Sequence, residues 1–119
     1  AYDDCLILSS DRTFAETSKA NLFLVVNQEL ITPPLSAGCL PGILRKIVLE
    51  TAEAIEIPHK EEPVSKEMLE KATEVFTTNV VSGIFPVRYI KGFDKTFTTH
   101  NNTVTRSLFQ FLLKIAADY

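Results

Sequence analysis

The sequence has no tryptophan, two cysteines and no long apolar run. Two cysteines cannot build a disulfide framework, and neither Cys5 nor Cys39 lies in a CxxC or Cys/His cluster of the kind that binds a metal. A bilayer span needs about 20 apolar residues, and the acidic, polar residues 1–4 do not resemble a signal peptide. We therefore expect a cytoplasmic protein with reduced thiols, no metal and no membrane contact.

An excess of basic charge is also missing. The 12 Lys and Arg residues are outnumbered by 15 Asp and Glu residues, and the basic residues are scattered along the chain. Nucleic-acid binding requires clustered basic side chains that displace counterions from phosphates, so we expect no nucleic-acid partner. With 45% hydrophobic residues among 119, the chain can form one core, and we expect a single domain over residues 1–119.

Short apolar, β-branched and aromatic runs predict strands along most of the chain. The runs lie at residues 5–8, 14–17, 22–26, 30–32, 75–78 and 84–90, and an extended segment with two prolines covers 57–64. Turn-forming residues separate the first four runs, so the opening third is predicted to be an antiparallel meander.

Three segments have helical periodicity or capping residues. Pro41-Gly42 introduces a helix that is predicted to run to about Ile55. Its expected inward residues are Leu40, Ile43, Leu44, Ile47, Val48 and Ala52. Ser65 is the expected cap of a second helix, and Asn101 or Asn102 that of a third. The inward residues of these two helices are expected to be Met68, Leu69 and Ala72, and then Val104, Leu108, Phe111, Leu112 and Ile115. The predicted fold class is mixed α/β (α+β), with an antiparallel-rich sheet and about three helices.

The segment 32–45 carries the pattern most suggestive of chemistry. Its Pro-Gly dipeptide enters a helix whose first-turn N–H groups have no partner within the helix. Together with the helix dipole, these groups form a site suited to a phosphate. The same pattern also occurs at helix starts that bind nothing, so both alternatives are open at this point.

Glu16 interrupts an apolar strand region, and residues 77–83 form a turn rich in hydroxyls and amides. An inward Glu16 would need a partner because an unpaired buried charge is costly, and the alternative is a strand residue that faces solvent. The turn could hold a second edge of an anion or simply connect two strands. His59 and His100 are expected at the surface, and Cys39, although close to the helix start, has no identifiable base and is not expected to be catalytic.

Three motifs follow one another along the chain: AETSKANLF at 15–23, TPP at 32–34 leading to LPGILR at 40–45, and EVFTTN at 74–79 leading to GI at 83–84 and PV at 86–87. In this order they resemble the second half of the fold-type IV, or class IV, pyridoxal-phosphate-dependent aminotransferases. The family includes branched-chain aminotransferases, D-amino-acid aminotransferases and aminodeoxychorismate lyases. The resemblance runs from Asp4 to about Tyr89 and implies the family's carboxy-terminal, cofactor-binding domain.

The resemblance implies roles for residues of these motifs. Glu16 matches the carboxylate that pairs with the pyridine nitrogen and keeps the cofactor ring protonated. Leu40 matches the residue on the ring face, and Asn21 matches a support of the strand that presents Glu16. The helix start that holds the phosphate corresponds to Gly42, Ile43 and Leu44. The turn that contacts the phosphate and the substrate carboxylate corresponds to Val80 and Val81.

Two positions depart from the family pattern. The family commonly has Thr in place of Leu44 and Thr or Ser in place of Val80, and each replacement removes a hydroxyl from the phosphate site. Losing such a hydrogen bond costs about 1.5–3 kcal/mol if nothing replaces it. The family's Schiff-base lysine and a phosphate-binding arginine lie upstream of the position that matches Asp4, and Lys19 is not at the lysine position, so no catalytic residue is expected here. The lysines expected to be solvated are Lys46, Lys60, Lys66 and Lys71.

The resemblance implies amino transfer between a branched-chain-like amino acid and a 2-oxo acid, with pyridoxal 5′-phosphate as cofactor. It also implies a homodimer and an amino-terminal domain outside this chain, in agreement with the missing initiator Met. A chain without the lysine is expected to be inactive by itself. Motif spacing leaves open an aminodeoxychorismate lyase, and the lost hydroxyls leave open a fragment that has kept the fold without catalysis.

Overall fold

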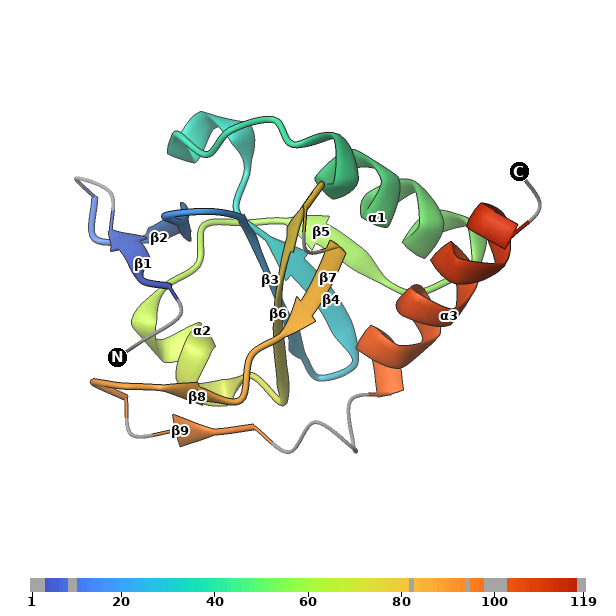
Figure 1. Ribbon diagram of the computed structural model, residues 1–119. Coiled ribbons are helices and arrows are strands. Elements are labelled where there is room, and N and C mark those ends of the chain that lie inside the picture. The colour runs from blue at the N-terminus through green and yellow to red at the C-terminus, as the bar shows by residue number, and fades with distance from the viewer. Residues whose placement is uncertain (1–3, 9–10, 82, 94, 98–102, 118–119) are drawn as a thin grey trace.

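The computed structural model describes residues 4–8, 11–81, 83–93, 95–97 and 103–117. A central sheet has α1 (Ile43–Ala54) and α3 (Thr103–Ala117) on one face and α2 (Lys66–Lys71) on the other (Figure 1). The strand order is β5-β4-β3-β6-β7. In chain order these are β3 (Asn21–Val26), β4 (Glu29–Thr32), β5 (His59–Glu61), β6 (Glu74–Asn79) and β7 (Gly83–Pro86). Because β4 and β5 are parallel and the other neighbours antiparallel, the expected α/β class with an antiparallel-rich sheet is confirmed.

The middle strand β3 is apolar on both faces. Phe23 and Val25 belong to the core under α1 and α3, whereas Leu22 and Leu24 belong to a second core under α2, because successive side chains of a strand alternate between faces. Phe23 stacks on Phe76 of β6 with the ring centroids 5.0 Å apart. A strand covered on both faces needs such a continuous apolar run, which is why the sequence predicted it correctly.

Two predictions about strands are wrong. The opening third is not one meander, because β1 (Leu6–Leu8) and β2 (Phe14–Thr17) form a separate sheet, and β3 pairs with β4 and β6. The predicted strand 84–90 is interrupted, because β7 ends at Pro86 and β8 (Tyr89–Ile90) pairs with β9 (Lys95–Thr96) in a third sheet. Proline has no N–H to donate to a ladder, which favours a break at Pro86.

The helix starts follow the prediction more closely than the helix faces do. Ser65 caps α2, since its hydroxyl oxygen accepts the N–H of Met68 at 3.2 Å. In α1, Val48 and Ala52 are buried as expected, but Ile43 and Ile47 are exposed. The helix instead turns the buried Arg45 toward the sheet, because acceptors for its guanidinium lie in the loop before α1 and on β5. A short 3-10 helix, η1 (Leu35–Ala37), lies in that loop.

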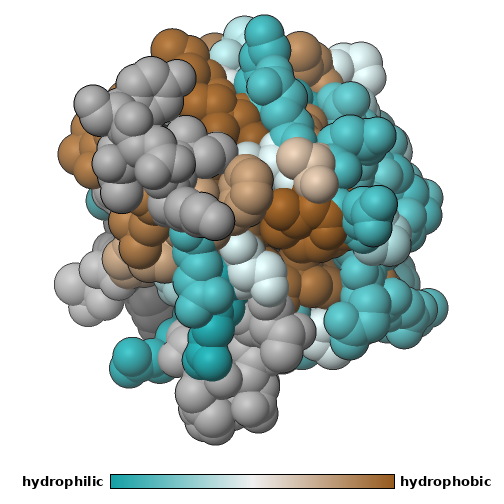
Figure 2. All heavy atoms as spheres, turned by 90° about the vertical axis from the view of Figure 1, so that its right-hand side faces the viewer, coloured by the Kyte–Doolittle hydropathy of each residue, from teal (hydrophilic) through white to brown (hydrophobic). Residues whose placement is uncertain are grey.

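The third helix packs on the same core as α1. Its buried or half-buried residues are Val104, Leu108, Phe111 and Leu112, as expected. The side chain of Ile115 and the expected caps Asn101 and Asn102 lie outside the described residues. On the side of the molecule that carries α1 and α3, apolar side chains interrupt the hydrophilic surface (Figure 2). Within the described ranges, no helix is both long enough and apolar enough to span a membrane.

Candidate functional site

An open depression of about 370 Å³ lies where the β2–β3 turn, the start of α1 and the end of β6 meet. These segments are distant in the sequence, and the pairing of β3 with β6 brings two of them together. The residues expected to bind the cofactor all line this depression, namely Glu16, Leu40, Gly42, Ile43, Leu44 and Val80. The expected substrate residue Val81 does not line it and is 92% exposed. The binding roles of all seven residues stay predictions.

Glu16 is half-buried on β2, and one of its carboxylate oxygens is engaged. Its Oε1 accepts the N–H of Leu40 at 2.9 Å, so the carboxylate has a partner of the kind that an inward orientation requires. Asn21, the first residue of β3, is buried and donates from Nδ2 to the carbonyl oxygen of Leu40 at 2.8 Å. The side chain of Leu40 is 71% exposed at the rim. The backbone of Leu40 is therefore fixed while its side chain stays open to a ligand.

The start of α1 faces the depression without a side-chain cap. Gly42 is the N-cap residue, and no side chain of the described chain accepts a hydrogen bond there as a cap. The N–H of Lys46 bonds to the carbonyl oxygen of Gly42 at 3.2 Å, whereas the N–H groups of the first turn have no carbonyl within the helix to bond. The amides of Ile43 and Leu44 are thus in a position where the helix dipole favours an anion.

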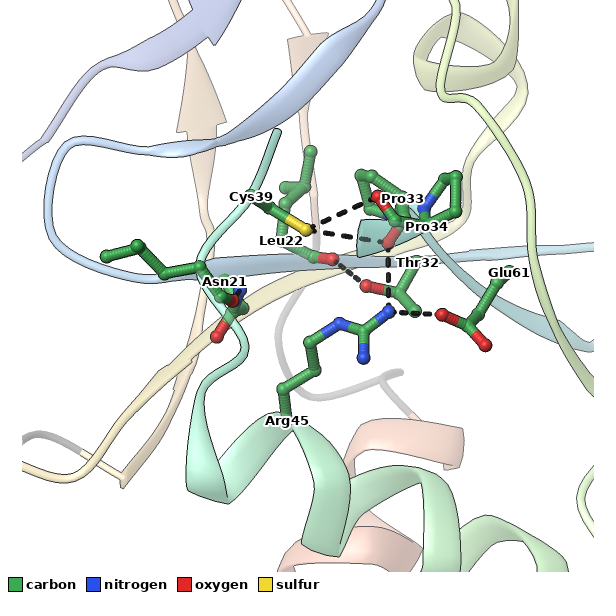
Figure 3. A network of polar contacts seen from close by, with 9 residues as sticks. Asn21, Leu22, Thr32, Pro33, Pro34, Cys39, Arg45 and Glu61 are labelled. Carbon is green, nitrogen blue, oxygen red and sulfur yellow. Dashed lines mark hydrogen bonds and ion pairs between the residues drawn. The ribbon is translucent and has the colours of Figure 1, made fainter. Parts of the chain in front are cut away.

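A partly buried polar network holds the loop that leads from β4 to α1 (Figure 3). Nη2 of Arg45 donates to the carbonyl oxygen of Pro33 at 3.1 Å and lies 2.5 Å from Oε1 of Glu61. The hydroxyl of Thr32 donates to the carbonyl oxygen of Leu22 at 2.7 Å. Sequence reasoning missed Arg45, because helical periodicity gives no sign that a charged side chain turns inward to a partner on another element.

Cys39 lies beside this network and is buried. Its Sγ is 3.5 Å from the carbonyl oxygen of Pro34 (Figure 3). Burial raises the pKa of the Cys39 thiol, and the attraction of Arg45 for the thiolate does not outweigh it. The nearby helix start therefore does not activate this thiol as a nucleophile.

Alkylation rates should separate the two thiols. Iodoacetamide should modify the exposed Cys5 roughly 100-fold faster than Cys39, because only an accessible thiolate reacts. Timed quenching and peptide mass mapping measure both rates in one sample. The rates should converge in urea, which serves as the control, and equal rates in the native chain would contradict the buried position of Cys39.

The turn between β6 and β7 closes one side of the depression. Oδ1 of Asn79 accepts the N–H of Val81 at 2.9 Å, and Val80 is 74% exposed. Thr78 lines the depression, but its hydroxyl oxygen is covered and has no hydrogen-bond partner among the described residues. Among the turn residues that the structure describes, Val80 therefore offers an apolar side chain to a ligand in the depression.

Other candidate residues lie away from the depression, with one exception. Lys19 is the one lysine that lines it among the residues the structure describes. The lysines expected to be solvated are exposed: Lys46, Lys60, Lys66 and Lys71.

His59 is half-buried rather than fully at the surface, with Nδ1 2.9 Å from the carbonyl oxygen of Ile57, and His100 lies outside the described residues. In the described part of the chain, no three His, Cys, Asp or Glu side chains gather in a way that could hold a metal.

Comparisons with known proteins agree on one family. A model of the class IV amino-transferases matches residues 1–90. The branched-chain-amino-acid aminotransferase of Escherichia coli (strain K12) is 34% identical over 91 residues, which are 76% of this chain and 29% of that protein. A solved structure of the branched-chain amino acid aminotransferase from Escherichia coli has 30% identity and a TM-score of 0.88 over 95% of this chain and 38% of that chain. The solved 4-amino-4-deoxychorismate lyase from Pseudomonas aeruginosa has 31% identity and a TM-score of 0.87 over 99% and 42%.

This chain thus spans less than half the length of these relatives. The matched residues 1–90 include every residue that lines the depression, from the β2–β3 turn to the end of β6. The match over these residues assigns this chain to the class IV aminotransferase family.

Proposed function

We propose that this chain forms one wall of the cofactor site of a pyridoxal 5′-phosphate-dependent aminotransferase, which transfers an amino group from a branched-chain-like amino acid to a 2-oxo acid. The observation that carries the proposal is a single depression with a half-buried carboxylate, Glu16, and an uncapped helix start at residues 42–44. A protonated pyridine nitrogen requires such an acceptor, and a phosphate requires such donors. The class IV family depends on this cofactor. The acceptor and the N–H donors in the depression are the groups that this cofactor needs.

The two ends of the depression would do different tasks. Glu16 would accept a hydrogen bond from the pyridine nitrogen through the oxygen that does not bind Leu40, and so keep that nitrogen protonated. The N–H groups of Ile43 and Leu44 would hold the phosphate, because Leu44 and Val80 carry no hydroxyl. Leu40 would cover the ring and exclude water. The bound cofactor supplies an electron sink for the substrate carbon that loses its proton.

We extend the proposal to the rest of the enzyme. Three of the apolar side chains that line the depression are exposed and form its rim: Leu40, Ile43 and Val80. Exposed apolar side chains at such a rim are typical of a surface that another domain or subunit covers. An amino-terminal domain that supplies the catalytic lysine, within a homodimer, would fit this rim and bring a substrate carboxylate to Val81. Both cysteines are free thiols, in keeping with the reducing cytoplasm.

A second candidate is aminodeoxychorismate lyase chemistry on the same cofactor. It is favoured because the TM-score to the solved lyase, 0.87, nearly equals the TM-score of 0.88 to the solved aminotransferase. Assays of the full-length parent with branched-chain amino acids and with aminodeoxychorismate separate the two. A parent that fails to bind pyridoxal phosphate would instead support a fold that has lost catalysis.

Titration of the 119-residue chain with pyridoxal phosphate, followed by phosphorus NMR, tests the proposal. The chain should bind the cofactor, and Glu16→Gln should weaken binding by roughly tenfold, because a charge-assisted hydrogen bond to the ring is lost. After borohydride reduction, peptide mapping should find no stoichiometric adduct on a single lysine. The isolated chain should be inactive in transamination.

Glu50→Gln is the matched control, because Glu50 lies on α1 with its side chain 66% exposed. This change should leave cofactor binding unaltered. Absence of binding by the chain would refute the cofactor site. A stoichiometric adduct on Lys19, the lysine at the depression, would instead move the catalytic lysine into this chain.

A further inference from the structure

The peptide backbone of Leu40 is held on both sides by residues that flank one turn. Its N–H donates to Oε1 of Glu16 at 2.9 Å, and its carbonyl oxygen accepts from Nδ2 of Asn21 at 2.8 Å. Glu16 and Asn21 lie on either side of the β2–β3 turn, which is closed by a bond from the N–H of Thr17 to the carbonyl oxygen of Ala20 at 2.9 Å. We call Glu16, Asn21 and the backbone of Leu40 the Leu40 clamp.

Gly42 fits against the same asparagine. A Cβ atom on Gly42 would lie 2.2 Å from Oδ1 of Asn21, closer than side chains approach one another. The φ of −61° and ψ of 142° at Gly42 are open to most residues. A side chain at position 42 is therefore disfavoured by space and not by conformation, because the Asn21 side chain would have to shift. The Asn21 side chain thus contacts the chain at Leu40 and at Gly42, immediately before α1 begins.

We infer that Asn21 is a positioning residue, which sets the amino end of α1 relative to Glu16 through the Leu40 clamp. The clamp itself follows from the two hydrogen bonds of Leu40 and the contact of Asn21 with Gly42. Its role in ligand binding rests on the proposed function. A ligand that reaches from Glu16 to the start of α1 needs these two groups at a fixed separation, since a displacement of about 1 Å can cost two orders of magnitude in rate. The exposed side chain of Leu40 supplies little packing of its own, so the backbone contacts must fix this position.

Native-state hydrogen exchange of the 119-residue chain, measured by NMR, tests the clamp. Asn21→Asp keeps the shape of the side chain and removes the Nδ2 donor, while Asn21→Ala removes the whole amide. In both variants the Leu40 amide should exchange about tenfold faster relative to the Leu30 amide. The Leu30 amide donates to the carbonyl oxygen of Pro58 at 2.8 Å and reports on global opening. The Gly38 amide, bonded within the loop at 3.0 Å, should not change.

Gly42→Ala supplies a second test, which examines the close approach of position 42 to Asn21. Because the added Cβ meets the Asn21 side chain, this change should speed exchange of the Leu40 amide by about tenfold in the unaltered chain. It should have no further effect in the N21A background. Asn27→Gly is the matched control, since Asn27 is exposed in the β3–β4 turn with φ of 50°. An unchanged exchange ratio in both Asn21 variants, or an equal effect of Gly42→Ala in both backgrounds, overturns the clamp.

Binding of two probes, pyridoxal phosphate and inorganic phosphate, tests what the clamp is for. Asn21→Ala should weaken binding of both by about tenfold, because the helix start that holds the phosphate is no longer fixed. If the Leu40 amide is released but binding is unchanged, Asn21 does not position the site and the inference fails. If the unaltered chain binds neither probe, the proposed function fails, while the exchange ratios still decide whether the clamp exists.

Discussion

Replacing Glu74 with alanine should lower the free energy of unfolding by about 3 kcal/mol and release the start of α3 from the sheet. Glu74 begins β6, is 3% exposed, and caps a helix that lies in a different part of the chain. Its Oε1 accepts the N–H and the hydroxyl of Thr105 at 2.9 and 2.8 Å, and its Oε2 accepts the N–H of Val104 at 3.3 Å. Alanine would leave these three donors buried without an acceptor and remove a negative charge that the helix dipole favours.

Urea unfolding followed by circular dichroism measures the loss, and exchange of the Val104 and Thr105 amides locates it. Glu74→Gln should cost less than Glu74→Ala, because the amide oxygen can take the place of Oε1 and still accept both bonds from Thr105. Glu70→Ala is the control, since Glu70 is exposed on α2, and it should change the free energy by less than about 0.5 kcal/mol. A Glu74→Ala variant as stable as this control would contradict the capping role.

Arg45→Ala should also destabilise the domain by about 3 kcal/mol. The Arg45 side chain is 7% exposed, and its guanidinium bonds to Glu61 and to the carbonyl oxygen of Pro33, so its removal leaves a cavity and an acceptor without its donor. The carboxylate of Glu61 is 48% exposed and can be solvated, which keeps the cost below that of a fully buried pair. Arg45→Met should cost only about 1 kcal/mol, since the aliphatic stem still fills the space and the buried Nε of Arg45, which lacks a partner among the described residues, no longer has to be desolvated.

The same urea titration measures both Arg45 variants. Lys46→Ala provides the control on the neighbouring position, because its side chain is 79% exposed and lies 4.0 Å from Glu50. This control should stay within about 0.5 kcal/mol of the unaltered chain. Faster alkylation of Cys39 in Arg45→Ala should accompany the loss, since Arg45 holds the loop that buries this thiol. Equal stabilities of Arg45→Ala and Lys46→Ala would show that the network does not hold the loop.

Local patterns predicted the elements whose own residues decide their structure. The continuous apolar run at 22–26 predicted β3, because a strand covered on both faces can be built only from such residues. Ser65 predicted the start of α2, because an N-cap hydroxyl bonds an N–H only three residues away. The Pro-Gly dipeptide predicted the start of α1 because it too acts on the residues that directly follow it.

Predictions failed where an element's surroundings decide its structure. The apolar residues Ile43 and Ile47 indicated a buried face that the structure leaves exposed. Helical periodicity locates an apolar stripe but does not reveal whether another element of the same chain packs against that stripe. The run 84–90 has strand-forming residues throughout, yet it changes sheets after Pro86 because the second half finds its partner in β9.

By itself the sequence determined the mixed α/β class, the resemblance to one family and six of the residues that line the depression, since all of these depend on short motifs and their order. Only the tertiary structure decided which distant groups meet: Glu16 with Leu40, Arg45 with Glu61, and Glu74 with Thr105, at separations of 24, 16 and 31 residues. The physical reason is that local pattern reports which way a side chain tends to face. The donor or acceptor that it meets there is supplied by the packing of another element, and no periodicity encodes it.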